Sequence, residues 1–235
     1  NTLILEVIDK PMDPVDEPEV ESQSDSDESP VAPGEERKSK HHHIHTHLKD
    51  HRDKTCLLGH RQSPINITTS EVIPDVTWHA FGTLENVDET HLIYHDSQLL
   101  VHYDQGEFTL IDDEGTSMWR SIQFHFHAPS EHHIDNKEYE GELHIVFRNE
   151  EDPTRLLVTG IFLESDPNAK PLQFIEHLNI KKVTDGDHIC DVKIDELYDF
   201  LKGHTVYYYK GSLTTPPYSE NVEWLPLKKP PPRPG

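Results

Sequence analysis

The chain has 235 residues, a formal charge of −23, 33% hydrophobic residues and a mean hydropathy of −0.72. Its length allows one domain with a sizeable core, but the hydrophobic share is low for a fully folded chain, so we expect part of it to lack a packed core. The negative charge opposes binding to nucleic acids and anionic membranes and attracts cations. The sequence contains no apolar run of the roughly 18 residues that a membrane-spanning helix needs.

Residues 1–55 form an acidic and histidine-rich region ahead of the first clear strand pattern. Residues 1–40 combine acidic residues, proline and serine with few aromatics, so they cannot bury enough apolar surface to offset ordering entropy, and we expect a disordered tail. Its carboxylates would attract calcium weakly because no loop geometry is fixed, and a plain solvated tail is the alternative. Histidine-rich tracts bind zinc, copper, nickel or cadmium. The candidate ligands for such additional divalent cations are His41, His42, His43, His45 and His47.

Residues 56–228 show short apolar or alternating runs separated by turn residues, which predict β-strands. We expect these strands over residues 65–68, 91–95, 99–103, 107–111, 122–127, 141–148, 155–162 and 205–209. Two helices are predicted over residues 171–178 and 194–201. The pattern indicates a mainly β domain with few helices, followed by an extended proline-rich end over residues 229–235.

Two histidines alternate with phenylalanines in the run Gln123-Phe124-His125-Phe126-His127. Because successive side chains of a strand point to opposite faces, the two histidines share one face and the two phenylalanines pack on the other. Scattered surface histidines are the alternative interpretation, since the chain has 19 histidines.

A third histidine favours a metal site over that alternative. His144 shares a face with Glu142 in another alternating segment, and pairing of the two segments would bring three imidazoles together. Zinc held by three neutral imidazoles keeps one tetrahedral position open, which is the catalytic arrangement. A water molecule in that position ionises with a pKa of about 7. We therefore predict zinc bound by His125, His127 and His144.

Several separated strings, taken together, resemble the α-class carbonic anhydrases. The match covers residues 56 to about 228 and rests on the strings Gln62-Ser63-Pro64-Ile65-Asn66-Ile67, Gln123-Phe124-His125-Phe126-His127, Ser130-Glu131-His132, Glu142-Leu143-His144 and Gly211-Ser212-Leu213-Thr214-Thr215-Pro216-Pro217. The resemblance implies a twisted, mostly antiparallel sheet of about ten strands. It also implies reversible hydration of carbon dioxide to bicarbonate and a proton by zinc-bound hydroxide.

The resemblance assigns roles residue by residue. Thr214 would accept a hydrogen bond from the zinc-bound hydroxide, which orients it, and would donate a hydrogen bond to Glu131. Gln123 and Glu142 would hydrogen-bond the outer nitrogens of the ligand histidines and so fix their tautomers. The predicted apolar wall that receives carbon dioxide, with the threonine beside it, comprises Val146, Val158, Leu213, Val222, Trp224 and Thr215.

Departures from the family pattern support a second hypothesis. The family's proton-shuttling histidine falls near Ser97 or Gln98, neither of which titrates near pH 7, although His95 is close. The chain also stops soon after Trp224, where the family continues. The alternative is therefore a non-catalytic or weakly catalytic glycoprotein of an extracellular fluid that binds or transports heavy metals or calcium, or handles mineral. By composition it resembles the histidine-rich metal-binding glycoproteins of molluscan fluids.

The remaining predictions concern the setting of the protein. The sequon at Asn66 indicates glycosylation and a secreted protein. Cys56 corresponds to half of a disulfide in secreted members of the family, and Cys190 is its candidate partner, with bonds to another chain as the alternative. Because the chain opens at Asn1, we expect a processed product or a fragment. The sequence leaves both a monomer and a homo-oligomer open.

Overall fold

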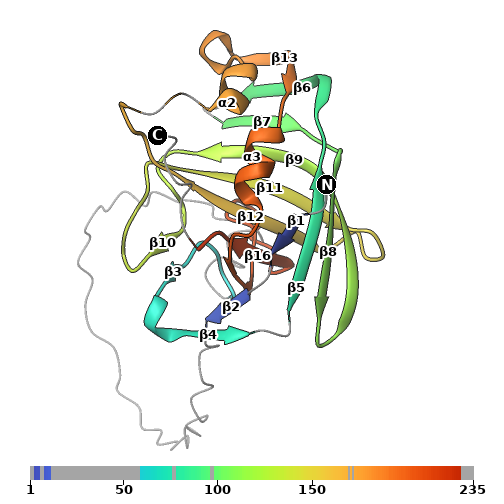
Figure 1. Ribbon diagram of the computed structural model, residues 1–235, viewed down its shortest axis with the longest axis vertical. Helices are drawn as coiled ribbons and strands as arrows, with labels where there is room; N and C mark the ends of the chain where they lie inside the picture. The colour runs from blue at the N-terminus through green and yellow to red at the C-terminus, as the bar shows by residue number, and fades with distance from the viewer. Residues whose placement is uncertain are drawn as a thin grey trace, which may run out of the picture.

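A large, mostly antiparallel sheet dominates the structure (Figure 1). The computed structural model describes residues 3–5, 8–11, 59–75, 78–95, 98–168, 170 and 172–228. Eleven strands form this sheet in the order β1-β5-β8-β9-β11-β12-β16-β15, with β7, β6 and β13 continuing from β9. This arrangement confirms the predicted fold class. Among the described residues, no helix is long and apolar enough to cross a membrane.

The elements have the following bounds. The strands are β1 Leu3–Leu5, β2 Ile8–Pro11, β3 Asn66–Ile67, β4 Val72–Asp75, β5 His79–Leu84, β6 Val87–His95, β7 Gln98–His102, β8 Gly106–Asp112, β9 Gly115–His127, β10 His133–Ile134, β11 Gly141–Asn149, β12 Leu156–Leu163, β13 Gly186–Val192, β14 Val206–Tyr207, β15 Tyr209–Gly211 and β16 Val222–Pro226. The helices are α2 Gln173–His177 and α3 Asp195–Leu201, with 3-10 turns at Thr69–Glu71 and Ile180–Lys182.

Every strand and helix predicted from the sequence is present in the structure, although one predicted strand is two strands there. The predicted strand over residues 205–209 splits into β14, which pairs with β2, and β15, which pairs with β16 in the large sheet. The sequence did not predict β13, where exposed polar residues interrupt the apolar ones, or β16, whose five residues are all buried. It also gave no strand for β4, β5 and β10, or for β1 and β2, which pair with β5 and β4.

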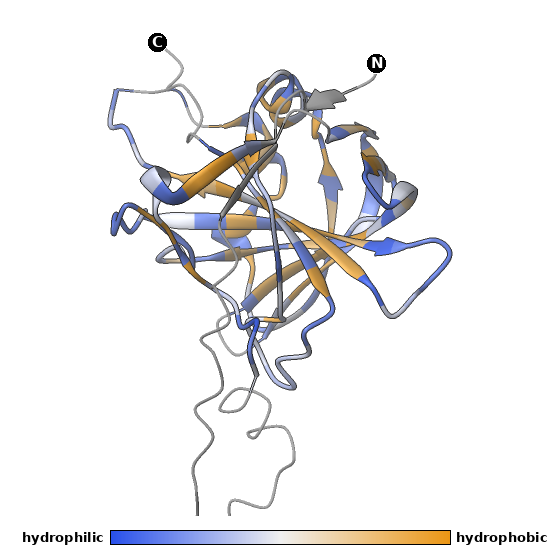
Figure 2. Ribbon diagram, turned by 90° about the horizontal axis from the view of Figure 1, so that it is seen from below, coloured by the Kyte–Doolittle hydropathy of each residue, from blue (hydrophilic) through white to orange (hydrophobic). Residues whose placement is uncertain are grey.

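The main core lies on the sheet face opposite the histidines. Phe124 is fully buried there, and its ring centroid lies 5.4 Å from that of Phe174 in α2. Leu143, Ile145 and Phe147 of β11 join the same cluster. Figure 2 shows apolar residues along the strands and polar residues in the connections between them. The alternation seen in the sequence therefore separates a packed face from a polar face of one sheet.

Candidate metal centre

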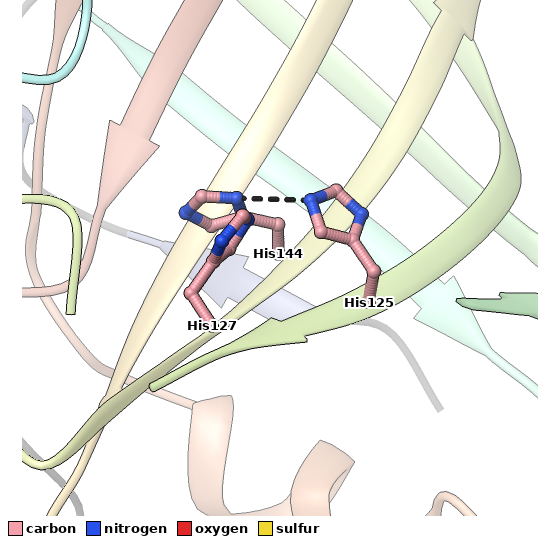
Figure 3. A group of neighbouring side chains, drawn as sticks. All are labelled: His125, His127 and His144. Carbon is pink, nitrogen blue, oxygen red and sulfur yellow. Dashed lines mark hydrogen bonds between the residues drawn. The ribbon is translucent and has the colours of Figure 1, made fainter. Parts of the chain in front are cut away.

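Pairing between β9 and β11 brings the three histidines together (Figure 3). His125 lies directly opposite His144, and His127 lies opposite Glu142. Each ring contributes one nitrogen, Nδ1 or Nε2, and these three nitrogens all lie within 4.8 Å of one another. The convergence expected from the alternating pattern is therefore present in the structure.

The spacing of the inner nitrogens suits a tetrahedral ion. His125 Nε2 and His144 Nδ1 are 3.3 Å apart. Two nitrogens bound to zinc at about 2.0–2.1 Å in a tetrahedron lie about 3.3–3.4 Å apart. His127 Nε2 is buried and has no hydrogen-bond partner among the described residues. A buried nitrogen without a partner is costly unless a ligand satisfies it, so the donor set fits a zinc ion.

Acceptor oxygens on the outer side of His125 and His144 favour lone pairs on the inner nitrogens of these two rings. Gln123 Oε1 is hydrogen-bonded to His125 Nδ1 at 2.9 Å, whereas Glu142 Oε1 lies 2.9 Å from His144 Nε2 as an ion-pair contact outside hydrogen-bond geometry. Because both oxygens are acceptors, each outer nitrogen carries the hydrogen in the neutral ring. The inner nitrogens then face one another as lone pairs, an arrangement that a cation stabilises.

The environment also keeps the rings of His125 and His127 neutral. Burial, followed by the neighbouring His144 and His127, lowers the pKa of His125 to about 3. Burial and then His144 likewise lower the pKa of His127. Neutral imidazoles are the form that binds metal, so these two ligands are ready to bind at neutral pH.

These lowered pKa values predict acid sensitivity of the metal-free protein. The unfolded chain binds a proton at each histidine near pH 6.5, whereas folded His125 does so only near pH 3. Between these values the unfolded state holds more protons, so stability falls as pH falls, by about 1.4 kcal/mol per pH unit for one such group. Urea unfolding of the metal-free protein between pH 3.5 and 7 measures this slope. His125→Asn should flatten it, and an equal slope for that variant would contradict the assignment to His125.

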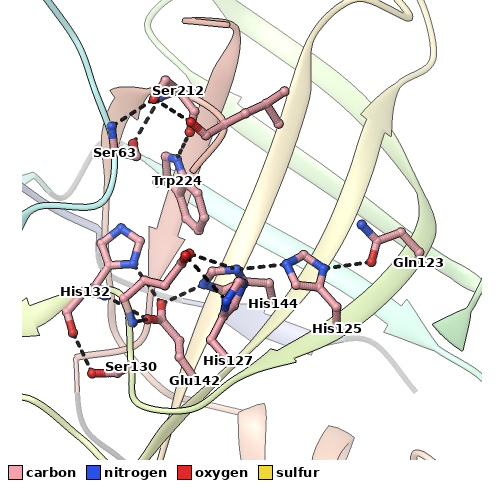
Figure 4. Close-up of polar contacts among 12 residues, drawn as sticks. Ser63, Gln123, His125, His127, Ser130, His132, Glu142, His144, Ser212 and Trp224 are labelled. Atoms are coloured by element: carbon pink, nitrogen blue, oxygen red, sulfur yellow. Dashed lines mark hydrogen bonds and ion pairs between the residues drawn. The ribbon is translucent and has the colours of Figure 1, made fainter. Parts of the chain in front are cut away.

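Glu142 connects the metal ligands to a buried polar network (Figure 4). Its side chain is fully buried, and its Oε2 accepts the backbone N–H groups of Glu131 and His132, both at 2.9 Å. Its Oε1 lies 2.8 Å from His132 Nδ1. Burial by itself raises the pKa of Glu142, but the N–H groups of His132 and His144 hold that pKa well below its usual range. The carboxylate is therefore ionised and fixed.

The hydrogen-bond network continues from His132 to Tyr209 on β15. His132 Nε2 is hydrogen-bonded to Tyr209 Oη, which lies 2.9 Å from Ser63 Oγ. Ser63 and Ser212 exchange two hydrogen bonds between backbone N–H and hydroxyl, at 2.9 and 3.0 Å. Sequence reasoning did not give roles to His132, Tyr209, Ser63 or Ser212, although three of them lie in the motif strings. The positions of Ser63, His132 and Ser212 within those motif strings are the sequence signal that could have indicated their roles.

Comparison with known proteins decides the family. The model of the eukaryotic-type carbonic anhydrases matches residues 44–232. The chain belongs to the α-class carbonic anhydrase family. It is 32% identical over 177 residues to a carbonic anhydrase of Nostoc sp., covering 74% of this chain and 65% of that protein. It is 34% identical over 185 residues to alpha carbonic anhydrase 3 of Arabidopsis thaliana, covering 75% of this chain and 63% of that protein.

Solved structures of carbonic anhydrases share the fold. The fungal α-carbonic anhydrase of Aspergillus oryzae superposes with a TM-score of 0.67 at 28% identity, covering 78% of this chain and 77% of that one. The enzyme of Thermovibrio ammonificans, solved with sulfanilamide, gives 0.59 at 25% identity, with 78% of each chain covered. The chain thus spans slightly less than two thirds of the two curated relatives above and about three quarters of these structures.

The predicted apolar wall of this carbonic anhydrase homologue is assembled beside the histidines. Val146, Val158, Val222 and Trp224 form one buried cluster, and Leu213 packs against it. The Trp224 and His144 ring centroids are 4.9 Å apart. The wall therefore reaches the metal ligands, whereas Thr215 is exposed.

The structure does not form the relay that the family resemblance implied. Thr214 is partly exposed, and among the described residues no hydrogen bond joins it to Glu131. Glu131 instead places Oε1 3.4 Å from His127 Nδ1, while its Oε2 is buried without a hydrogen-bond partner. The same Oε2 lies 4.0 Å from His144 Nδ1, so the Glu131 carboxylate contacts two of the three ligand rings in this structure. The role of Thr214 stays a prediction.

The other predicted residues lie away from this centre. Asn66 is exposed and exchanges two hydrogen bonds with Asn136. Cys190 is buried on β13 with a free thiol, whose pKa burial raises to about 11. Gln98 is exposed, opposite His95. Cys56, Ser97 and the candidate tail ligands His41, His42, His43, His45 and His47 lie outside the described residues.

Proposed function

We propose that this protein is a zinc-dependent carbonic anhydrase that hydrates carbon dioxide reversibly to bicarbonate and a proton. The observation that carries the proposal is the convergence of the imidazoles of His125, His127 and His144 beside a buried apolar wall. Membership of the carbonic anhydrase family supports the same substrate.

The chain's own residues would divide the work between holding the metal and holding the substrate. When bound, zinc lowers the pKa of a water ligand to about 7 and so supplies a nucleophile at neutral pH. Gln123 and Glu142 keep the ligand rings in the metal-binding tautomer. Val146, Val158 and Trp224 offer carbon dioxide, which is apolar, a surface without competing hydrogen bonds.

Stopped-flow carbon dioxide hydration by the full chain tests the proposal. We expect the zinc-loaded protein to hydrate carbon dioxide above the buffer rate, to lose this activity with a chelator and to regain it with one equivalent of zinc. The assay should contain an imidazole buffer, which accepts the product proton if the protein does so slowly. Zinc bound at one equivalent without hydration above buffer would overturn the enzyme proposal.

That negative outcome would favour the second candidate, divalent-metal binding without efficient catalysis. Its support is compositional, namely the charge of −23 and the 19 histidines. We further propose secretion and glycosylation at Asn66, whose exposure on β3 is compatible with an attached sugar.

A further inference from the structure

A cluster of two histidines and one aspartate lies on β6, β7 and β13, the strands that continue the sheet beyond β9 (Figure 1). His91 Nδ1 lies 3.1 Å from both carboxylate oxygens of Asp187. The His91 and His102 ring centroids are 6.2 Å apart, with the ring planes nearly perpendicular. All three side chains are exposed.

Strand register places this group on the same face as the three histidines of the metal centre. His125 lies opposite Leu100, Leu100 opposite Ile93, and Ile93 opposite Asp187. Two residues along each strand, Gln123 lies opposite His102. His91 is one step beyond the Leu92–Val101 pair and therefore lies opposite His102. Residues directly opposite in adjacent strands share a face.

The register also separates the two groups. Neighbouring strands are about 4.8 Å apart and residues along a strand rise about 3.3 Å each. His102 is thus one strand and two residues from His125, and His91 is one strand further. Leu100 and Ile93 continue the row of His125, and His102 and His91 continue the row of Gln123. An ion held by His91 and His102 would not share a ligand with the first centre.

The combination of imidazole nitrogens and a carboxylate oxygen favours a divalent transition-metal ion. The ligand atoms of His91, His102 and Asp187 do not all lie within 4.8 Å of one another in this structure, so binding of one ion requires the exposed rings to rotate. Rotation can bring them together, because side chains directly opposite in an antiparallel pair have Cβ atoms about 4.5–5.5 Å apart. Asp187 already lies against His91 and adds an anionic oxygen. Two imidazoles and a carboxylate with open positions suit Cu²⁺ or Ni²⁺, and Cu²⁺ binds such donors most tightly.

We propose that His91, His102 and Asp187 form a second binding site for a divalent transition-metal ion, separate from the His125, His127 and His144 centre. It does not depend on the hydratase activity. The protein would then bind metal at two places on one face of its sheet.

Amide NMR of the full, zinc-loaded chain tests the site during a titration with Cu²⁺ that continues until further Cu²⁺ causes no new broadening. A paramagnetic ion broadens nearby resonances, so we expect selective loss of the amide signals of Leu92, Val101 and His188. The double variant His91→Asn/His102→Asn should lose this local broadening and bind Cu²⁺ there at least about tenfold more weakly, since even outer partners of a metal change affinity by about 10–100-fold.

A matched variant controls for other histidines. His79→Asn/His133→Asn removes two strand histidines from β5 and β10 and should leave the broadening on β6 and β7 unchanged. Histidines of residues 41–47 are present in all three proteins, so their binding does not distinguish them. Absence of broadening on β6 and β7 in the wild type, or its persistence in the first double variant, would overturn the second site. Broadening confined to β9 and β11 with release of zinc would do the same.

Discussion

Replacing Glu142 with glutamine should lower both the free energy of unfolding and the affinity for zinc. The carboxylate is fully buried and accepts two backbone N–H groups while facing His132 and His144. An amide has the same shape but one acceptor oxygen fewer and no charge. Losing one partner of a buried charged network costs about 3–5 kcal/mol, and losing an outer partner of a ligand lowers metal affinity by about 10–100-fold.

Urea unfolding of the zinc-free protein and zinc competition with a chelator measure the two effects separately. Glu138→Gln is the matched control, because the Glu138 side chain is 56% exposed and its only close ion pair with a described residue is 3.7 Å from His133. That variant should differ from wild type by less than about 0.5 kcal/mol. Equal stability of the two variants would show that Glu142 is not ionised in the folded protein.

Replacing His144 with alanine should produce the largest loss of zinc binding and of hydration. His144 supplies one of three converging nitrogens, and the inner faces of His125 and His127 alone leave a two-coordinate site. We expect zinc affinity to fall by more than about 100-fold, beyond the effect of losing an outer partner. Hydration at a fixed free zinc concentration should fall to the buffer rate.

Zinc occupancy by equilibrium dialysis, measured with the hydration rate, distinguishes loss of metal from loss of fold. Far-ultraviolet circular dichroism should retain the strand signal of the wild type. His79→Ala, an exposed histidine on β5, is the control and should keep both occupancy and rate. Full zinc occupancy in the His144 variant would mean that the metal is held elsewhere in the chain.

The sequence predicted the parts of the centre that depend on local alternation. His125, His127 and Gln123 share one strand, so their common face follows from a period of two residues. The pairing with His144 needed a second alternating strand, which the sequence also displays. These residues could be predicted because the geometry of one strand fixes them relative to one another.

Contacts between distant segments could not be predicted in the same way. Ser63 and Ser212 are 149 residues apart, and the hydrogen bond between Tyr209 and His132 spans 77 residues. The orientation of the Glu131 carboxylate toward His127 depends on side-chain packing, which no local pattern specifies. The edge strand β13 was missed because most of its residues are exposed, so its pairing with β6 is needed to order it.

The position of β11 within the sheet has a consequence for metal binding. This strand lies between β9 and β12, and eight of its nine residues are buried. The backbone that carries His144 is held on both edges, and β9 is held in the same way. Capture of an ion therefore requires little further loss of conformational freedom from the ligands, and most of the intrinsic coordination energy is retained as affinity.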